Sequence, residues 1–233
     1  VWLQSKADQV ATMGKIRKDL DGLGVVFGMR WAEAGLEHGA VSLRQLDLKP
    51  EQLRHYRSEK KRIEWELGEP HLTIALRMLV EQLKTKEMVA MAREFYNEGR
   101  HVVLFLNHTA AIDEIAGELG ADILDGRTKD KDAVKKRFQN NEQPFLVVQN
   151  QAGGTGLSLQ DLHGVPRASI ISPGWSSQQF RQVLGRIDRA NQVSLPVQVV
   201  VTCRRTIEDR VGSALKQKLR NLDAVLDQDL ELS

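Results

Sequence analysis

The sequence has little of the special chemistry that would reveal a function at once. It contains a single cysteine, Cys203, which excludes an internal disulfide and fits a reducing, intracellular compartment. Aromatic residues make up only 5% of the chain, so the core is expected to be aliphatic. No apolar run approaches the ~20 residues that a membrane-spanning helix requires, and no membrane partner is expected. The formal net charge of +2 gives no global attraction to nucleic acid, so any such surface has to be a local patch.

The sequence also lacks the parts that hold a nucleotide and its metal ion in P-loop NTPases. No GxxxxGK[ST] loop occurs in it, and no predicted strand ends in an acidic pair that could bind Mg²⁺. The glycine-rich stretch DGLGVVFG near the N-terminus does not have the spacing of a phosphate loop. None of the six histidines stands at a metal-ligand spacing from Cys203 or another histidine, so no metal site is expected. Because the chain opens at Val1 and not at a methionine, we expect a piece of a longer protein.

Hydrophobic periodicity divides the 233 residues into three parts. Residues 1–48 are punctuated by glycine and predict a linker or extension, with a short hairpin of strands near 25–31 and 41–48 as one option. Residues 49–100 predict a helical lead-in, in which one helix starts at a proline and the second stops at Gly99. The two helices are predicted over 50–67 and 72–97.

Residues 101–233 alternate between short aliphatic runs and helical stretches. The strongest runs are apolar on both faces, as in strands that helices cover on each side. This alternation predicts a three-layer α/β domain with a mainly parallel sheet of about five or six strands. Ligands of such domains bind at the carboxyl ends of the strands, so functional residues are expected in those loops. Strands are predicted at 102–107, 121–124, 145–148, 168–171 and 197–201, and helices at 109–119, 129–140, 176–189 and from a TIED capping box at Thr206.

Three predicted strands end in loops whose residues could bind an anion. Gly153, Gly154 and Gly156 in QNQAGGTGLSLQ would let the backbone approach a ligand closely, although a plain turn between strand and helix remains an alternative. The other two loops offer side chains at predicted helix starts. They hold Asn107 and His108 before a helix capped by Thr109, and Arg127 beside a cap at Thr128. Roles confined to helix capping, or to a solvated loop, are equally open for them.

The most informative residues are Gln182, Arg186 and Arg189, which stand at i, i+4 and i+7 of the helix predicted over 176–189. At about 100° per residue they fall within roughly 60° of one helix face. Two guanidiniums and an amide on one stripe suit the binding of phosphate oxygens, because arginine offers a planar fork of donors. A solvated charged face is the alternative, and Trp175 just upstream is interpreted as a packing anchor or a stacking platform.

Together these segments resemble the second, C-terminal RecA-like lobe of superfamily 2 helicases, and most closely that of the Swi/Snf-type DNA translocases. The match runs in register over about residues 41–226, and the combination is specific although each segment alone is not. The run from Trp175 through Gln182, Arg186, Arg189 and Gln192 keeps the family's spacing of W, Q, R, R and Q. The other matching segments are LKPEQLRHY, VVLFLNHTAAID, LDGRTKDKDAVKKRFQN, VVQNQAGGTGLSL and TIEDRV.

The resemblance implies a RecA-like fold and a role for each matching residue. Arg186 and Arg189 would be the catalytic arginine fingers that reach the γ-phosphate of ATP, and Gln182 would help to position the nucleotide. Gly154 and Gly156 would couple the nucleotide to the nucleic acid. ATP and Mg²⁺ would be held mainly by an N-terminal RecA-like lobe that this chain lacks. The residues that would face the phosphodiester backbone of duplex DNA are Asn107, His108, Arg127, Thr128 and Gly153.

The leading hypothesis is therefore the second motor lobe of an ATP-dependent DNA translocase or helicase, inactive as an ATPase by itself. A second hypothesis is a non-catalytic nucleic-acid or protein-binding module that reuses the same lobe. A third is an RNA helicase of the same superfamily. Lobes of that kind usually carry His-Arg-x-Gly-Arg at the finger helix, whereas the first of these positions here is Gln182.

Overall fold

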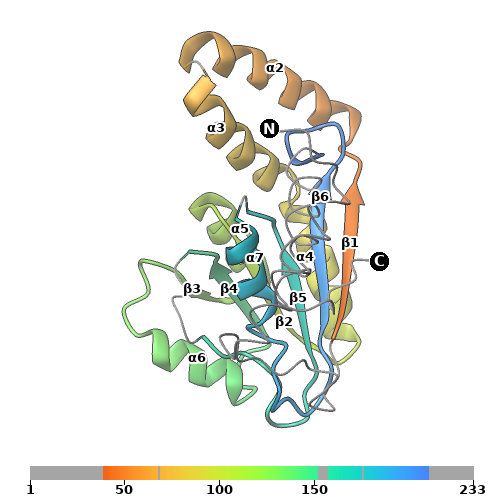
Figure 1. Ribbon diagram of the computed structural model, residues 1–233, viewed down its shortest axis with the longest axis vertical. Helices are drawn as coiled ribbons and strands as arrows, with labels where there is room; N and C mark the ends of the chain where they lie inside the picture. Colours follow the sequence, from red (N-terminus) through yellow and green to blue (C-terminus); the bar gives the residue numbers. More distant parts are fainter. Residues whose placement is uncertain (1–38, 68, 152–156, 175, 210–233) are drawn as a thin grey trace, which may run out of the picture.

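The computed structural model describes residues 39–67, 69–151, 157–174 and 176–209 of the chain, and its centre is a six-stranded sheet (Figure 1). The strands lie in the order β1-β6-β5-β2-β4-β3, and every neighbouring pair is parallel. The predicted α/β class and the parallel sheet are confirmed. The strands are β1 (Ala40–Leu46), β2 (His101–Leu106), β3 (Asp122–Leu124), β4 (Phe145–Gln149), β5 (Arg167–Ile171) and β6 (Val197–Cys203).

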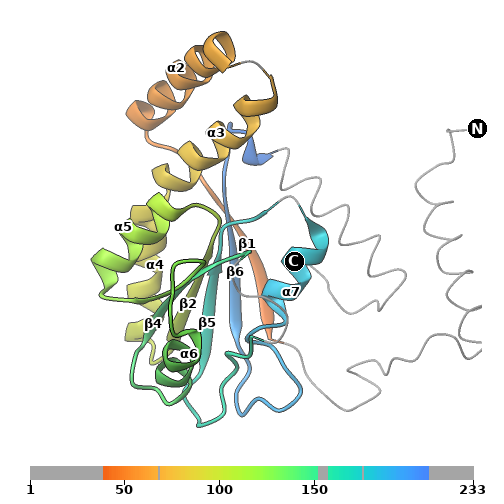
Figure 2. The ribbon, with the colours of Figure 1, turned by 90° about the vertical axis from the view of Figure 1, so that its left-hand side faces the viewer.

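Helices cover both faces of the sheet. Buried side chains of α4 and α5 pack on one face, and those of α6 and α7 pack on the other. Figure 2 shows α4 and α5 on one side of the strands and α7 on the opposite side. The remaining two helices, α2 and α3, form a hairpin that projects beyond the carboxyl edge of the sheet (Figure 1). The helices are α2 (Pro50–Leu67), α3 (Glu69–Leu83), α4 (Thr85–Asn97), α5 (Thr109–Leu119), α6 (Lys131–Gln139) and α7 (Ser177–Leu184).

Residues 102–106 of the central strand β2 are all apolar because both of its faces are buried. In β2, Val102 and Leu104 point toward α4 and α5, whereas Val103 and Phe105 point toward α6 and α7. All four side chains are fully buried. Successive side chains of a strand alternate between its faces, so a continuous aliphatic run is the pattern that a doubly covered parallel sheet requires.

The segment Ala40–Leu46 differs from its expected place in an N-terminal extension. It forms edge strand β1 of the main sheet and pairs in parallel with β6, from Ala40 beside Val197 to Leu46 beside Cys203. Gly39 opens this strand at a point where a Cβ atom would lie 2.3 Å from the carbonyl oxygen of Pro196, so the close approach requires glycine. The other half of the predicted hairpin, near residues 25–31, lies outside the described residues.

The helix predicted over 72–97 is divided in the structure at Lys84, between α3 and α4. Two contacts satisfy the carbonyls that the break leaves open. The side-chain amide of Gln52 donates to the carbonyl of Leu83 at 2.9 Å, and the hydroxyl of Thr85 donates to the carbonyl of Gln82 at 2.9 Å. The prediction of one uninterrupted helix was therefore wrong, whereas its end before Gly99 is confirmed, since α4 stops at Asn97 and Gly99 has a φ of 83°.

The side chain of Lys84 is fully buried and ties this break to the end of β6. Its Nζ donates to the carbonyl of Val201 at 3.0 Å and to a carboxylate oxygen of Glu208 at 2.6 Å. The other carboxylate oxygen of Glu208 accepts from the backbone N–H of Cys203 at 2.9 Å. The buried charges are thus paired and hydrogen-bonded, as a buried ion pair must be to avoid a large desolvation cost.

The last described helical residues are Glu208 and Asp209, so this helix begins two residues after Thr206, and Thr206 is not the residue directly before it. The Thr206 hydroxyl accepts from the N–H of Glu208 at 3.2 Å. Asp209 reaches back to the N–H of Arg205 at 2.6 Å, one residue earlier than in the predicted capping box. None of the described helices is long and apolar enough to span a bilayer.

Burial makes Cys203 chemically inert in the folded chain. Its side chain is fully buried, and burial raises the pKa of the thiol to about 12, although the nearby Lys84 opposes the shift. We expect native chain to react with a thiol reagent at about pH 8 more than about 100-fold slower than free cysteine, whose pKa is near 8.5. Cys203 is the only cysteine, so a Cys203→Ser variant supplies the blank and denatured chain supplies the full signal. Rapid labelling of the native chain would contradict this expectation.

Candidate functional site

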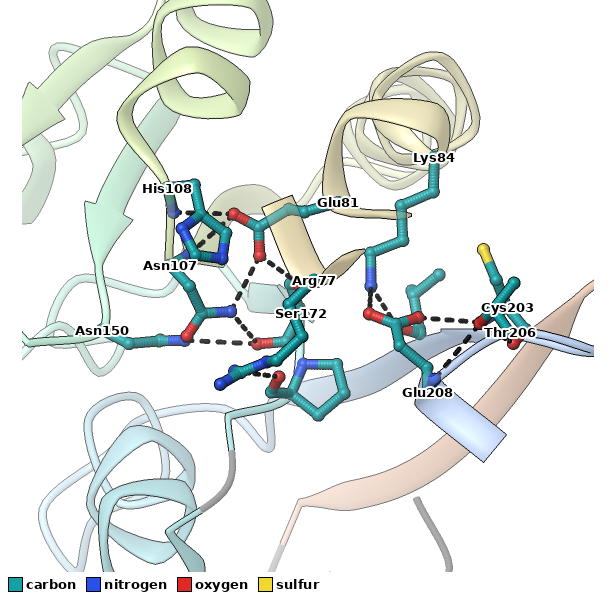
Figure 3. A network of polar contacts seen from close by, with 12 residues as sticks. Arg77, Glu81, Lys84, Asn107, His108, Asn150, Ser172, Cys203, Thr206 and Glu208 are labelled. Carbon is teal, nitrogen blue, oxygen red and sulfur yellow. Dashed lines mark hydrogen bonds and ion pairs between the residues drawn. The ribbon is translucent and has the colours of Figure 1, made fainter. Parts of the chain in front are cut away.

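Polar residues gather where three neighbouring strands end at the carboxyl edge of the sheet. Asn107, Asn150 and Ser172 directly follow β2, β4 and β5, respectively. The side-chain amide of Asn150 donates to Asn107 Oδ1 at 2.9 Å and to the carbonyl of Ser172 at 3.2 Å (Figure 3). The side-chain amide of Asn107 donates to the same Ser172 carbonyl at 3.3 Å. This network fixes the starts of three loops relative to one another.

A buried carboxylate of α3, that of Glu81, holds the network from above. One of its oxygens accepts from the backbone N–H groups of Asn107 and His108 at 2.9 and 2.8 Å. The other oxygen accepts from Asn107 Nδ2 at 2.8 Å and from the Ser172 hydroxyl at 2.5 Å (Figure 3). Glu81 is 1% exposed, so its charge is compensated by these four donors and not by bulk water.

Arg77, one helical turn before Glu81, adds a second contact between α3 and the segment after β5. Its guanidinium donates to the carbonyl of Pro173 at 3.4 Å. Burial lowers the pKa of Arg77, whereas the negative charge of Glu81 opposes that shift. Both α3 side chains therefore hold the chain immediately before Trp175, which itself lies outside the described residues.

The start of α5 differs from the prediction. His108 is the N-cap residue and Thr109 is the first helical residue, so the assignment of Thr109 as the cap was wrong. The His108 side chain makes no cap bond, and the backbone N–H of His108 donates to the Glu81 carboxylate. Burial lowers the pKa of His108, with Glu81 opposing and Arg77 adding to the decrease. Within the described part of the chain, Nε2 of His108 is buried without a hydrogen-bond partner.

The loop after β3 also differs in its capping residue. Asp130, and not Thr128, caps α6 and accepts from the N–H of Ala133 at 2.9 Å. Thr128 is directed inward, where its hydroxyl accepts from the N–H of Asp125 and donates to the carbonyl of Ile123, both at 3.0 Å. The expected cap at Thr128 was wrong because its hydroxyl closes the turn instead of the helix.

Arg127, in the same turn, is bound by two carboxylates. Its guanidinium donates to both oxygens of Asp113 at 3.0 and 2.6 Å, and its Nε donates to Asp125 at 2.8 Å. Hydrogen bonds to Asp113 and then Asp125 raise the pKa of Arg127. The side chain is 52% exposed, so one face remains accessible, but the local charge is already balanced. Contact of Arg127 with a phosphodiester backbone stays a prediction.

The predicted stripe of Gln182, Arg186 and Arg189 is not a helix face in the structure. Helix α7 ends at Leu184, and the cap residue Gly185 is followed by a turn. The N–H of Arg186 bonds to the carbonyl of Val183 at 3.1 Å, a three-residue step that tightens and ends the helix. Gln182 is exposed, whereas Arg186 is buried and Arg189 is half-buried. The prediction that these three residues share one helix face was therefore wrong.

The structure nevertheless brings both arginines next to the chain that leaves the glycine segment. The backbone carbonyl of Arg186 accepts from the N–H of Leu159 at 2.8 Å. The guanidinium of Arg189 donates to the carbonyl of Leu157 at 3.3 Å and to that of Gly185 at 2.9 Å. Gly153, Gly154 and Gly156 lie outside the described residues, but residues 157–159 directly follow them.

The two arginines make an electropositive environment. Arg186 is 5% exposed, and its guanidinium carbon lies 5.9 Å from the centre of the Phe105 ring. Burial lowers the pKa of Arg186, and the positive charge of Arg189 lowers it further. Because the positive charge of Arg189 disfavours the charged form of Arg186, an anion placed near both would be stabilised. Within the described residues, no group of three His, Cys, Asp or Glu side chains is placed to hold a metal ion.

Sequence reasoning missed Glu81, Arg77, Asn150 and Ser172. Asn150 and Ser172 carry the same signal as Asn107, since each stands at the end of an aliphatic strand. Glu81 follows the buried Val80, and a helical wheel places it about 100° away, at the border of the apolar stripe. A carboxylate at such a border is a weak signal, because most acidic residues there are solvated.

Comparisons with known proteins agree on one kind of domain. Residues 126–232 match the family model described as the C-terminal domain on Strawberry notch homologue. A protein of Acanthamoeba polyphaga mimivirus, named provisionally as an ATP-dependent RNA helicase, is 27% identical over 161 residues, or 67% of this chain. The chain spans only 30% of the length of that relative. The solved C-terminal part of the Fun30 ATPase domain shares the fold at a TM-score of 0.55 and 13% identity, over 81% of this chain and 97% of that one.

The role of Glu81 as the organiser of the strand-end loops can be tested by an isosteric change. Glu81→Gln places an NH₂ group where one carboxylate oxygen now accepts two hydrogen bonds, so two donors lose their partner. We expect a loss of about 2–4 kcal/mol of unfolding free energy, measured by urea denaturation. Glu94→Gln on the exposed side of α4 is the matched control and should change stability by less than about 0.5 kcal/mol. Equal stabilities of the two variants would contradict the role.

Proposed function

We propose that this chain, which is similar to helicase C-terminal domains, acts as the second motor lobe of an ATP-dependent, Swi/Snf-type DNA translocase or helicase. One observation carries the proposal. Residues 157–159, which follow the glycine segment, bond directly to the backbone or side chain of Arg186 and Arg189. A lobe that couples nucleotide to nucleic acid needs such a contact between its two binding elements.

On this proposal Arg186 and Arg189 are the groups that contact the nucleotide. Their environment fits a polyphosphate, since two mutually repelling guanidiniums lie together and Arg189 Nη1 makes no hydrogen bond to any described residue. When bound, ATP supplies the phosphoryl group whose transfer builds negative charge. The two guanidiniums stabilise that charge, and a preorganised arginine of this kind contributes about 10³–10⁵ in turnover. Gln182 is exposed near the end of α7, and the proposal assigns it to contact with the nucleotide.

The proposal assigns the rest of the nucleotide site to another lobe. The GxxxxGK[ST] loop that holds phosphates and Mg²⁺ does not occur in the 233 residues, so ATP and Mg²⁺ are held mainly by an N-terminal RecA-like lobe. On this proposal, His108, Arg127 and Gly153 are the residues that contact the phosphodiester backbone of duplex DNA. Asn107 and Thr128 act there by fixing their loops, because their side chains are bonded inward. The free, buried thiol of Cys203 accords with a reducing intracellular compartment.

A first prediction concerns the chain by itself. Without a phosphate loop, the purified 233-residue chain should not hydrolyse ATP, with or without DNA, in an assay of phosphate release. The same assay on a longer protein that includes an N-terminal lobe should show turnover. DNA-stimulated hydrolysis by the 233-residue chain would overturn the division of the site between two lobes.

A second prediction concerns the arginines in that longer protein. Arg186→Ala or Arg189→Ala should lower kcat by about 10³–10⁵, while nucleotide affinity changes only a few-fold. Because Arg186 is buried, Arg186→Lys and a thermal unfolding measurement should accompany it, so that loss of folding is recognised. Arg93→Ala, exposed on α4, is the matched control and should retain full turnover. Unchanged turnover in both finger variants would refute their assignment.

A second candidate function is an RNA-dependent motor, which the name of the mimivirus relative favours. The two candidates differ in the polymer that stimulates hydrolysis. We expect duplex DNA to raise ATP turnover of the two-lobed protein more than duplex RNA of the same sequence does. Stronger stimulation by RNA would overturn the proposal of a DNA motor in favour of an RNA-dependent motor. The proposed division of the nucleotide site between two lobes would be unaffected.

A further inference from the structure

Helix α2 carries a row of cations that ends in an exposed tryptophan. Arg54, Arg57, Lys61 and Trp65 stand at i, i+3, i+7 and i+11, within roughly 80° of the helix circumference. The row is about 16 Å long at a rise of 1.5 Å per residue. We call these four residues the α2 stripe. All four are exposed, and Trp65 is 92% exposed.

The α2 stripe is not needed for the packing of α2. The helix buries Leu53, Tyr56 and Ile63 against α3 and the end of β6, in a separate apolar cluster. Trp65 contributes nothing to that cluster, although tryptophan is a residue that proteins usually keep largely buried. An exposed indole that the fold does not use is therefore available to a partner.

The cations of the α2 stripe differ from their neighbour Arg62 in their pairing. Arg62 is neutralised by Glu59 at 2.7 Å and by Glu66 at 2.6 Å, on another side of the helix. Within the described part of the chain, Arg54, Arg57 and Lys61 form no ion pair. The stripe thus combines three cations that form no ion pair with a described residue and an aromatic surface, which together complement a polyanion whose units carry flat bases.

The position of the α2 stripe connects it to the proposed motor site. The α2–α3 hairpin projects beyond the carboxyl edge of the sheet, where the loops after β2, β4 and β5 lie (Figure 1). Through Glu81 and Arg77, α3 bonds directly to the loops after β2 and β5. The hairpin that carries the α2 stripe therefore lies at the same edge of the sheet as those loops.

We propose that the α2 stripe binds single-stranded nucleic acid, with Arg54, Arg57 and Lys61 on successive phosphates and an unpaired base stacked on Trp65. Phosphate contacts supply affinity without sequence preference, and stacking tolerates every base. The stripe discriminates a single strand from a duplex, because paired bases do not expose a face to Trp65. The inference rests on the proposed function only in requiring that the protein works on nucleic acid.

The phosphate contacts are tested by the salt dependence of binding. A fluorescent oligonucleotide of mixed sequence is titrated with the 233-residue chain at several salt concentrations, and anisotropy is recorded. For single strands each phosphate contact contributes about 0.7 to the slope of log K against log salt. The triple variant Arg54→Ala, Arg57→Ala, Lys61→Ala should reduce the slope by about 2. A triple variant with the same change in net charge, Lys86→Ala, Arg93→Ala, Lys136→Ala on α4 and α6, should leave it nearly unchanged.

The stacking contact is tested at Trp65. Trp65→Ala should weaken single-strand binding about 5- to 100-fold, Trp65→Phe should restore most of it, and binding to the duplex should change little in either variant. Folding is not at risk, because the side chain is exposed. Arg62→Ala, on the same helix but ion-paired, should bind like the unchanged chain.

The outcomes separate this inference from the proposed function. Nucleic-acid binding that is insensitive to all stripe variants would overturn the stripe and leave the motor proposal standing. Equal weakening of single-strand and duplex binding by Trp65→Ala would also overturn the stacking assignment. If the chain bound neither DNA nor RNA, the assignment of the α2 stripe would be overturned. Loss of ATP turnover in the Arg186 and Arg189 variants would still support the motor proposal in that case.

Discussion

The buried carboxylate of Glu81 is the constraint on which the arrangement of the candidate site depends. Helix α3 precedes the α/β alternation in sequence, and apolar packing alone would hold it without fixing its rotation, because the hydrophobic effect is not directional. Hydrogen bonds are directional, and four of them meet at Glu81. They join α3 to the loop after β2 and to the loop after β5. The carboxyl edge of the sheet therefore includes a side chain from outside the sheet-and-helix repeat.

The early end of α7, on the other face of the sheet, likewise fixes a loop of the candidate site. In a helix that continued to Arg189, the carbonyl of Arg186 would accept from the N–H four residues later. Because the helix ends at Leu184, that carbonyl is open, and it accepts from Leu159 instead. Ile187, fully buried beneath the sheet, draws the chain inward at this point. The segment after the glycines is thus held by the backbone of the arginine loop, which a regular helix could not have done.

The strands were predictable from the sequence because burial on both faces leaves an unbroken aliphatic run, as in β2 and β4. The strand ends, and with them Asn107 and His108, followed from the same pattern. The break at Lys84 and the end of α7 were not predictable, since both depend on tertiary contacts made by Gln52 and Leu159 from elsewhere in the chain. The caps at Thr109 and Thr128 were also wrong. His108, one residue before Thr109, is the N-cap residue of α5, and the Thr128 hydroxyl closes a turn within its own loop.

The α2–α3 hairpin connects the α2 stripe to the loops at the carboxyl edge of the sheet. On its outer side α2 carries the stripe that we assign to single-stranded nucleic acid, and at its inner end α3 carries Glu81 and Arg77. The buried pair of Lys84 and Glu208 fixes the base of the hairpin to the end of β6. A load on the stripe would therefore reach the loops after β2 and β5 through directional, buried bonds and not through a compliant linker. That path ends at the segment before Trp175 and α7, so a strand held at α2 and a nucleotide held at Arg186 and Arg189 would act on one rigid edge of the same sheet.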